Sequence, residues 1–173
     1  MNGAHPPVIL LAGPTASGKT SLSIALAKAV DGEIVNADSM QLYADLQIVS
    51  ARPDAAEQAG IPHHLFGSCD AAERYSAGWW ARAALEKISE IRARGRRPIL
   101  VGGTGLYFEA LTQGLAAMPE ITRETRMRAD AIAAEGDEKL RETARSFDPE
   151  ATARIEANDL QRLRRIVEIG LQT

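Results

Sequence analysis

A glycine-rich octapeptide, GPTASGKT over residues 13–20, constrains this chain more than any other feature. It matches the phosphate-loop pattern G-x-x-x-x-G-K-[ST] in full, and its flanks fit the pattern's structural context. The apolar run 8–12 before it predicts a buried strand, and the apolar spacing of residues 21–30 predicts a helix. A strand, a glycine turn and a helix bring backbone N–H groups and a positive helix end around an anion. The motif therefore predicts an α/β fold and a site for a diphosphate or triphosphate group.

The first two thirds of the chain continue the alternation of strands and helices. Residues 33–37 and 98–101 predict two further buried strands, and residues 75–94 and 106–112 predict helices. Such alternation is typical of a parallel sheet. We therefore expect a P-loop NTPase-like parallel sheet, flanked by helices, over residues 1–117.

The chain changes character from about residue 118. No strand-like run remains, and helices are predicted over residues 122–135, 136–147, 149–156 and 158–171. We expect a helical insertion over residues 118–160 and the start of a return to the core over residues 161–173. Because three strands make a small sheet, we expect the sheet to be incomplete in this chain.

Composition excludes several classes of protein. The 173 residues are 45% hydrophobic and 25% charged, which is ordinary for a globular protein. A net charge of −3 argues against nucleic-acid binding through bulk charge alone. The single cysteine, Cys69, excludes a disulfide framework, and no apolar run is long enough to span a membrane. We expect a cytoplasmic protein with no membrane partner.

Each residue of the phosphate loop has a predicted part in binding. Lys19 supplies a cation for a terminal phosphate, and the hydroxyl of Thr20 suits Mg²⁺. A chance glycine turn is the alternative, and the flanking strand and helix disfavour it. The predicted phosphate-binding residues are Gly13, Pro14, Thr15, Ala16, Ser17, Gly18, Lys19 and Thr20.

The acid that P-loop kinases and NTPases usually carry at a strand end is missing here. The strand 98–101 ends in Gly102-Gly103-Thr104 instead. Asp38, after the second strand, is the candidate acid, and it can hold Mg²⁺ through water or act as a general base. Because loops at the carboxyl ends of parallel strands line one crevice, we expect the phosphate loop, Asp38 and Thr104 along one rim. The alternatives are that Asp38 caps the next helix and that Thr104 is a plain turn residue.

Three segments together resemble the tRNA dimethylallyltransferase (tRNA isopentenyltransferase) family: GPTASGKT (13–20), NADSMQLY (36–43) and GGTGLYF (102–108). IPHHL (61–65), RYS (74–76) and NDLQRLRR (158–165) fit the same family in the same order. The resemblance implies Mg²⁺-dependent transfer of a dimethylallyl group from its diphosphate to N6 of the adenosine at tRNA position 37. It also implies that the helical insertion faces tRNA and that tRNA and dimethylallyl diphosphate are the partners. Separately, we expect the chain to be a monomer.

The resemblance also assigns roles to residues. Asp38, Thr104 and Lys19 are the implied catalytic residues, with Asp38 as the base. The implied tRNA-binding residues are Asp38, Ser39, Met40, Gln41, Thr104, Arg126, Gln161, Arg162, Leu163, Arg164 and Arg165.

This chain departs from the family in one loop and in length. Members usually have a segment close to IGTAKP where this chain has IVSARP (48–53), and their chains are much longer. Three alternatives stay open. An adenylate dimethylallyltransferase is disfavoured by the helical insertion and QRLRR. A small-molecule P-loop kinase is disfavoured by the missing acid. The third is an inactive, truncated phosphate-binding fragment.

Overall fold

The computed structural model describes residues 6–73, 75–116 and 118–173. The chain divides into two compact units, Met1–Leu115 and Ala116–Thr173. This division lies close to the predicted boundary between residues 117 and 118. Residue 117 itself and Arg74 of the RYS segment lie outside the described residues.

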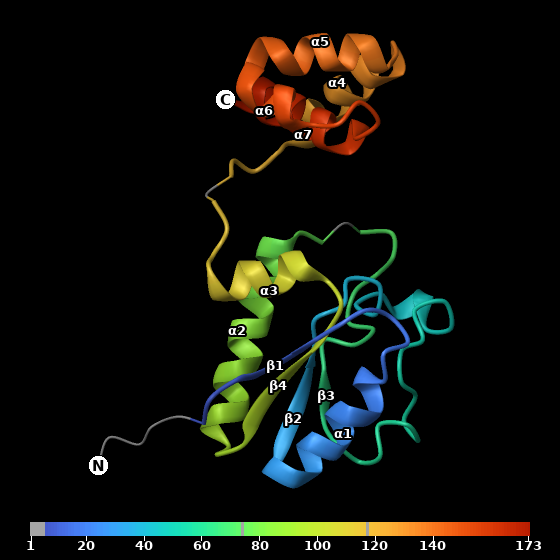
Figure 1. Ribbon diagram of the computed structural model, residues 1–173, viewed down its shortest axis with the longest axis vertical. Coiled ribbons are helices and arrows are strands. Elements are labelled where there is room, and N and C mark those ends of the chain that lie inside the picture. Colours follow the sequence, from blue (N-terminus) through green and yellow to red (C-terminus); the bar gives the residue numbers. More distant parts are fainter. Residues whose placement is uncertain (1–5, 74, 117) are drawn as a thin grey trace, which may run out of the picture. The chain divides into compact units, whose positions relative to one another are not determined.

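A parallel sheet forms the centre of the first unit (Figure 1). Its strands lie in the order β1-β4-β2-β3. All three predicted strands are present, and a two-residue strand joins the sheet as a fourth. The strands are β1 (Ile9–Ala12), β2 (Gly32–Asn36), β3 (His63–His64) and β4 (Arg97–Gly102). The predicted α/β fold with a parallel sheet is confirmed.

Helices connect these strands, and their ends follow the local sequence. The first unit contains α1 (Lys19–Val30), the short 3₁₀ helix η1 (Ala44–Leu46), α2 (Ala77–Ala93) and α3 (Gly105–Thr112). Helix α2 begins after Ser76, whose hydroxyl accepts a hydrogen bond from the N–H of Trp79 at 3.1 Å. Just beyond its end, Gly95 has a φ of +75°, which a residue without a Cβ adopts at little cost. Ser76 and Gly95 therefore mark the two ends of the helix.

The core of the first unit lies on both faces of the sheet. Because successive strand residues point to opposite faces, Val35 packs against α2, while its neighbour Ile34 packs against α1. Figure 1 shows the two helices on opposite sides of the sheet. Trp80 of α2 is fully buried, whereas Trp79 is half-buried at the edge of the same cluster. Strands β2 and β4 therefore have apolar side chains on both faces, as the sequence predicts.

The second unit is helical. It contains α4 (Arg123–Ala134), α5 (Asp137–Phe147), α6 (Pro149–Arg154) and α7 (Leu160–Gln172). Its core is formed by Ala129, Leu140, Ala144, Leu163 and Val167. Asp148 caps α6 by accepting a hydrogen bond from the N–H of Ala151 at 2.8 Å, and Pro149 occupies the first turn. Helix α7 packs within this unit, and the predicted return of residues 161–173 to the sheet stays a prediction.

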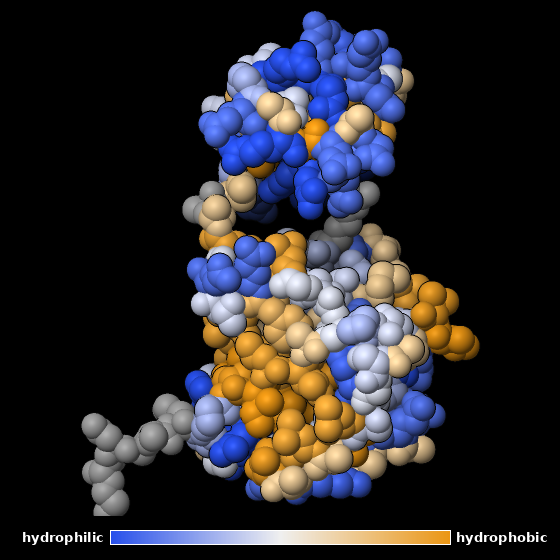
Figure 2. Space-filling view, in the orientation of Figure 1, coloured by the Kyte–Doolittle hydropathy of each residue, from blue (hydrophilic) through white to orange (hydrophobic). Residues whose placement is uncertain are grey.

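Some apolar surface stays exposed on the first unit. Figure 2 shows a broad apolar area on this face of the unit. Strand β1 pairs with β4 on one side and has no second neighbour among the described residues. In the described part of the chain, no helix is long and apolar enough to cross a membrane.

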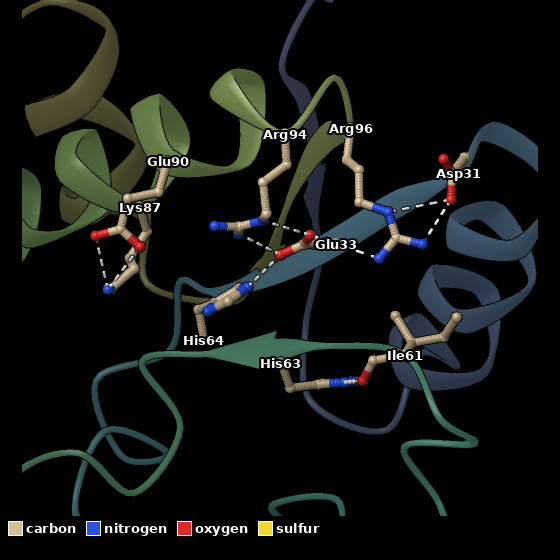
Figure 3. Close-up of polar contacts among 9 residues, drawn as sticks. All are labelled: Asp31, Glu33, Ile61, His63, His64, Lys87, Glu90, Arg94 and Arg96. Carbon is tan, nitrogen blue, oxygen red and sulfur yellow. Dashed lines mark hydrogen bonds and ion pairs between the residues drawn. The ribbon is translucent and has the colours of Figure 1, made fainter.

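An ion cluster around the buried side chain of Glu33 lies at the amino-terminal end of the sheet (Figure 3). Glu33 of β2 has a side chain only 3% exposed, and it lies 2.7 Å from Nη2 of Arg94 and 2.6 Å from Nε2 of His64. Arg96 lies 3.5 Å from the same carboxylate and 2.6 Å from Asp31. Burial alone would raise the pKa of Glu33, but the hydrogen bonds and charges of Arg94 and His64 lower it to about 2. The cluster ties β2 to β3 and to the turn between α2 and β4.

We expect this cluster to make stability depend on pH. Because the folded pKa of Glu33 lies below its ordinary value of 4.5, the ionised carboxylate stabilises the fold fully above pH about 5. That stabilisation, on the order of 2–3 kcal/mol, is lost as the pH falls toward 2. Urea unfolding across this pH range should show a steep loss of stability in the wild type and a flatter profile in Glu33→Gln. Glu86→Gln, a change of an exposed α2 carboxylate, is the control. Equal slopes for Glu33→Gln and the wild type would contradict the assignment.

Candidate active site

The phosphate loop has the backbone shape of an anion site. Ala16 and Gly18 both have positive φ, +63° and +81°, and α1 begins directly after Gly18. Left-handed residues in such a turn direct neighbouring N–H groups toward one point, where the helix end adds positive charge. The ammonium of Lys19 donates to the carbonyl oxygen of Pro14 and lies 3.5 Å from Oγ of Ser17. The side chain of Lys19 therefore lies across the phosphate loop, where it is predicted to bind a terminal phosphate.

Three neighbouring strand ends meet beside this loop. The N–H of Gly13, after β1, donates to the carbonyl of Gly102 at the end of β4. The N–H of Ala37, after β2, donates to Val101 at 2.8 Å, and the N–H of Thr104 donates to Ala37 at 3.2 Å. Gly102 permits this approach, because a Cβ there would overlap the backbone carbonyl of Ala37. The phosphate loop, Asp38 and Thr104 thus share one rim, as expected from the sequence.

A cavity of about 530 Å³ opens at this rim, a volume that suits a small ligand. It brings most of the phosphate loop together with Asp38 and Gln41. Its lining also includes Ser50, Ala51 and Glu57, which the sequence did not single out. The full lining is Thr15, Ala16, Ser17, Gly18, Lys19, Thr20, Ser21, Ile24, Asp38, Gln41, Ser50, Ala51, Glu57, Val101 and Gly102.

The carboxylate of Asp38 is held in a tight turn. The side chain of buried Asn36 accepts from the N–H of Asp38 at 2.8 Å and donates to its carbonyl at 2.9 Å. Oδ1 of Asp38 accepts from the N–H of Met40 at 2.9 Å, and Oδ2 has no hydrogen-bond partner in the described part of the chain. Residues 39–42 form a turn, so the alternative that Asp38 caps a following helix is wrong. One carboxylate oxygen stays available to a ligand.

Thr104 lies next to this turn. Its hydroxyl accepts from the N–H of Ser39 at 2.9 Å and donates to the hydroxyl of Ser39 at 3.3 Å. Neither residue lines the cavity, although Ser39 directly follows Asp38, which does. Thr104 therefore links the loop after β4 to the turn that carries Asp38.

The departure from IGTAKP leaves the loop unstrained at its changed positions. Val49 has no positive φ, so the backbone does not require glycine there. Ser50 keeps a hydroxyl, which donates to the carbonyl of Leu46 at 2.6 Å, and Arg52 keeps a cation. The loop thus keeps a hydroxyl group at residue 50 and a positive charge at residue 52, although both side chains differ from those usual in the family.

The remaining tRNA-binding predictions fall in the second unit, so the predicted set is divided between the two units. Arg162 pairs with Asp159 at 2.8 Å, Arg164 with Asp130 at 2.6 Å, and Arg165 with Glu168 at 3.0 Å. The side chain of Leu163 is fully buried in the core of the unit, where it serves packing. Gln161 and Arg126 are exposed.

The cavity's donors fit a magnesium ion bound chiefly by a ligand's phosphates. Within residues 6–73, 75–116 and 118–173, no three His, Cys, Asp or Glu side chains converge on one point. The hydroxyl of Thr20 and the carboxylate of Asp38 both line the cavity. Oxygen donors of this kind suit Mg²⁺, which usually takes one or two protein ligands, waters and substrate phosphates.

Comparison with known proteins identifies the family. A family model described as IPP transferase matches residues 41–173, and one described as isopentenyl transferase matches residues 6–65. The chain belongs to the IPP transferase family.

Relatives in this family are close in sequence. The tRNA dimethylallyltransferase of Maricaulis maris is 60% identical over 168 residues, which cover 96% of this chain and 54% of the relative. That of Phenylobacterium zucineum is 53% identical over 170 residues, covering 98% and 55%. The chain thus spans about half the length of the curated relatives it matches.

Solved structures support the same family and fold. A eukaryotic dimethylallyltransferase acting on tRNA aligns with a TM-score of 0.76 at 33% identity, covering 95% of this chain and 41% of the other. The full-length tRNA isopentenylpyrophosphate transferase of Bacillus halodurans aligns with a TM-score of 0.63 at 36% identity, covering 98% and 56%. The P-loop NTPase-like sheet flanked by helices is thereby confirmed for this IPP transferase chain.

The close approach at Gly102 yields a stability prediction. Gly102→Ala should destabilise the first unit by about 3 kcal/mol or more, because the new methyl group collides with backbone that cannot move aside cheaply. Gly105→Ala, three residues on, meets open space and should change stability by less than about 0.5 kcal/mol. Urea unfolding of both variants measures the difference. Equal changes in the free energy of unfolding for the two variants would show that the close approach of the strand ends does not require glycine at residue 102.

Proposed function

We propose that this chain transfers a dimethylallyl group from dimethylallyl diphosphate to N6 of the adenosine at tRNA position 37, next to the anticodon. The products are N6-isopentenyladenosine and diphosphate. The observation that carries the proposal is a cavity lined by both the phosphate loop and Asp38, with no acid at the end of β4. The close relatives named tRNA dimethylallyltransferase support the same reaction. The proposed substrates place the chain in the cytoplasm, where it acts as a monomer.

The phosphate loop would bind the leaving group. As the allylic C–O bond breaks, negative charge develops on the diphosphate. Lys19, the loop N–H groups and the positive end of α1 stabilise that charge as it forms. Thr20 would hold Mg²⁺, which when bound supplies further positive charge for the departing diphosphate.

Asp38 would act on the nucleophile. The exocyclic amine of adenine attacks weakly, because its lone pair is delocalised into the ring. A C–N bond forms to the dimethylallyl carbon while the C–O bond breaks, and the amine proton passes to the free Oδ2 of Asp38. The hydroxyl of Thr104, held against Ser39, lies beside these groups and orients the turn that carries Asp38.

The tRNA would be bound by two groups of residues. The adenosine must leave its base stack to reach a carboxylate in a cavity. Ser39, Met40 and Gln41, which follow Asp38 directly, contact the extruded base and its neighbours. Polar side chains of the second unit contact the RNA, namely Arg126, Gln161, Arg162, Arg164 and Arg165.

The base assignment predicts the effect of one substitution. Asp38→Asn should reduce transfer by at least about 100-fold, the low end of the contribution of a general base, while binding of inorganic diphosphate changes little. The assay mixes the chain with unmodified tRNA, dimethylallyl diphosphate and Mg²⁺, and mass spectrometry of the digest detects adenosine heavier by C5H8. Asp45→Asn alters an exposed carboxylate outside the cavity and is the control. Normal transfer by Asp38→Asn would exclude Asp38 as the base. Magnesium-dependent ATP turnover without transfer would favour a kinase.

The RNA-binding assignment predicts a difference between two matched arginines. Arg162 and Arg154 are both exposed, 75% and 71%, and each pairs with a carboxylate one helical turn away. Arg162→Ala should weaken tRNA binding and make the slope of log K against log salt shallower by about one unit. Arg154→Ala should change neither quantity. Fluorescence anisotropy over a salt series measures the tRNA affinity and its salt dependence. Equal values for the two variants would show that Arg162 is an ordinary solvent-exposed side chain that does not contact tRNA.

A further inference from the structure

The loop between Tyr43 and Arg52 forms part of the cavity wall and is closed by its own hydrogen bonds. The N–H groups of Ser50, Ala51 and Arg52 donate to carbonyls of residues 46–48 at 3.0 to 3.1 Å. Ser50 and Ala51 then line the cavity beside the phosphate loop. The position of this wall therefore depends on how firmly the loop is closed.

Apolar packing does not close the loop. Its tip residues Ile48 and Val49 are 93% and 81% exposed, and a knob of apolar surface projects from the first unit in Figure 2. Two β-branched side chains in water contribute nothing to holding the loop in place. The loop's shape must therefore come from its polar contacts.

The guanidinium of Arg52 supplies those contacts across the loop. Nη1 donates to the carbonyl of Tyr43 at 3.2 Å, and Nη2 donates to the carbonyl of Ala44 at 3.1 Å. Nη2 also lies 3.4 Å from Oε1 of Gln47. The planar fork thus joins the end of the loop to its beginning, a geometry that suits arginine.

Two further observations describe the surroundings of the Arg52 guanidinium. A Cβ at Gly67 would overlap the guanidinium, so a glycine leaves the space that the fork occupies. Among the described residues, no carboxylate lies within ion-pair distance of Arg52. The cation is therefore directed at backbone carbonyls, and its role is to fix their positions.

The closed loop in turn orients the side chain of Gln41. Nε2 of Gln41 donates to the carbonyl of Ser50 at 3.0 Å and lies 3.5 Å from that of Ala51. Because both neighbours are carbonyl oxygens, the nitrogen of the amide must face them. Oε1 is left as the group that Gln41 offers to a ligand in the cavity.

We propose that Arg52 is a positioning residue that acts through Gln41. By closing the loop, it places the carbonyl of Ser50, which holds the Gln41 amide with its acceptor oxygen toward the ligand. A ligand group that donates a hydrogen bond, such as an exocyclic amine, is then favoured over one that accepts. The identity of that ligand rests on the proposed function, whereas the link from Arg52 to Gln41 rests on the contacts above.

Nuclear magnetic resonance of the 173-residue chain tests this link without any transfer reaction. The side-chain NH₂ signals of Gln41 are assigned by their loss in Gln41→Ala. Arg52→Met removes the fork and keeps an unbranched stem, Arg52→Lys keeps the cation, and Arg82→Met changes an exposed arginine of α2 as the control. Backbone hydrogen exchange is recorded for the loop and for strand β4.

In Arg52→Met we expect the Gln41 NH₂ signals to move to the position of a free glutamine side chain. Exchange at Ser50 and Arg52 amides, or at residue 52 of the variant, should quicken by about tenfold or more. Arg52→Lys should retain the Gln41 signals in large part, and Arg82→Met should match the wild type. The β4 amides should stay protected in every variant.

Unchanged Gln41 signals in Arg52→Met would overturn the proposal. Loss of β4 protection in both Arg52 variants would also overturn it, because Arg52 would then be a general stabiliser of the unit. If Arg52→Met loses β4 protection but Arg52→Lys keeps it, the Arg52→Lys variant decides. Gln41 NH₂ signals at the wild-type position in Arg52→Lys support the proposal. Gln41 NH₂ signals at the position of a free glutamine side chain in Arg52→Lys contradict it. A chain that fails to transfer a dimethylallyl group but shows the expected spectra would refute the proposed function and leave this link intact.

Discussion

A single buried amide, the side chain of Asn36, holds the candidate site together. It accepts from the N–H of Asp38, donates to the carbonyl of Asp38, and donates to the carbonyl of Leu65 at 3.0 Å. Its own backbone carbonyl accepts from the indole of Trp80 at 2.8 Å. Because an unpaired polar group in this fully buried position would be costly, the end of β2, the segment after β3 and helix α2 are fixed to one another. These contacts of Asn36 therefore also fix the position of the Asp38 carboxylate.

The two ends of the sheet carry charge for different purposes. At the amino-terminal end, Glu33 is almost fully enclosed and is satisfied by Arg94 and His64, so its charge serves the fold. At the carboxyl end, Asp38 keeps an oxygen without a hydrogen-bond partner among the described residues, beside a cavity that also contains Lys19. A saturated carboxylate has no capacity left for a ligand, whereas a half-saturated one can take a proton or a cation. This contrast distinguishes Glu33, which stabilises the fold, from Asp38, the proposed general base.

The sequence predicts the site best where local chemistry and strand order act together. The phosphate loop is recognisable because strand, glycines, lysine and helix follow one another in the chain, and Asp38 is found because parallel strands end on one edge. The position of β3 is harder to predict, since two histidines carry little periodic signal and their strand partners, Ile34 and Val35, lie far back in the sequence. Glu57 escaped notice for the same reason, and the segment with Ser50 and Arg52 was noted only for its departure from the family, because nothing in the immediate neighbours of these residues marks a loop that folds back over the phosphate site. The buried side chain of Leu163 shows the opposite limit, because a motif assigned to RNA also contributes to a core.

Several arginines of the second unit are paired with carboxylates, namely Arg154, Arg162, Arg164 and Arg165. Arg164 bridges Asp130 and Glu168, at 2.6 and 3.4 Å, and so joins α4 to α7. A phosphate group that approaches such an arginine competes with an existing partner, and the gain in free energy is smaller than for a free guanidinium. Pairing also fixes the side chains, which lowers the conformational entropy that binding would cost. The tRNA binding proposed for this surface would therefore depend on the geometry of prearranged guanidinium groups more than on net charge, which is −3 for the chain.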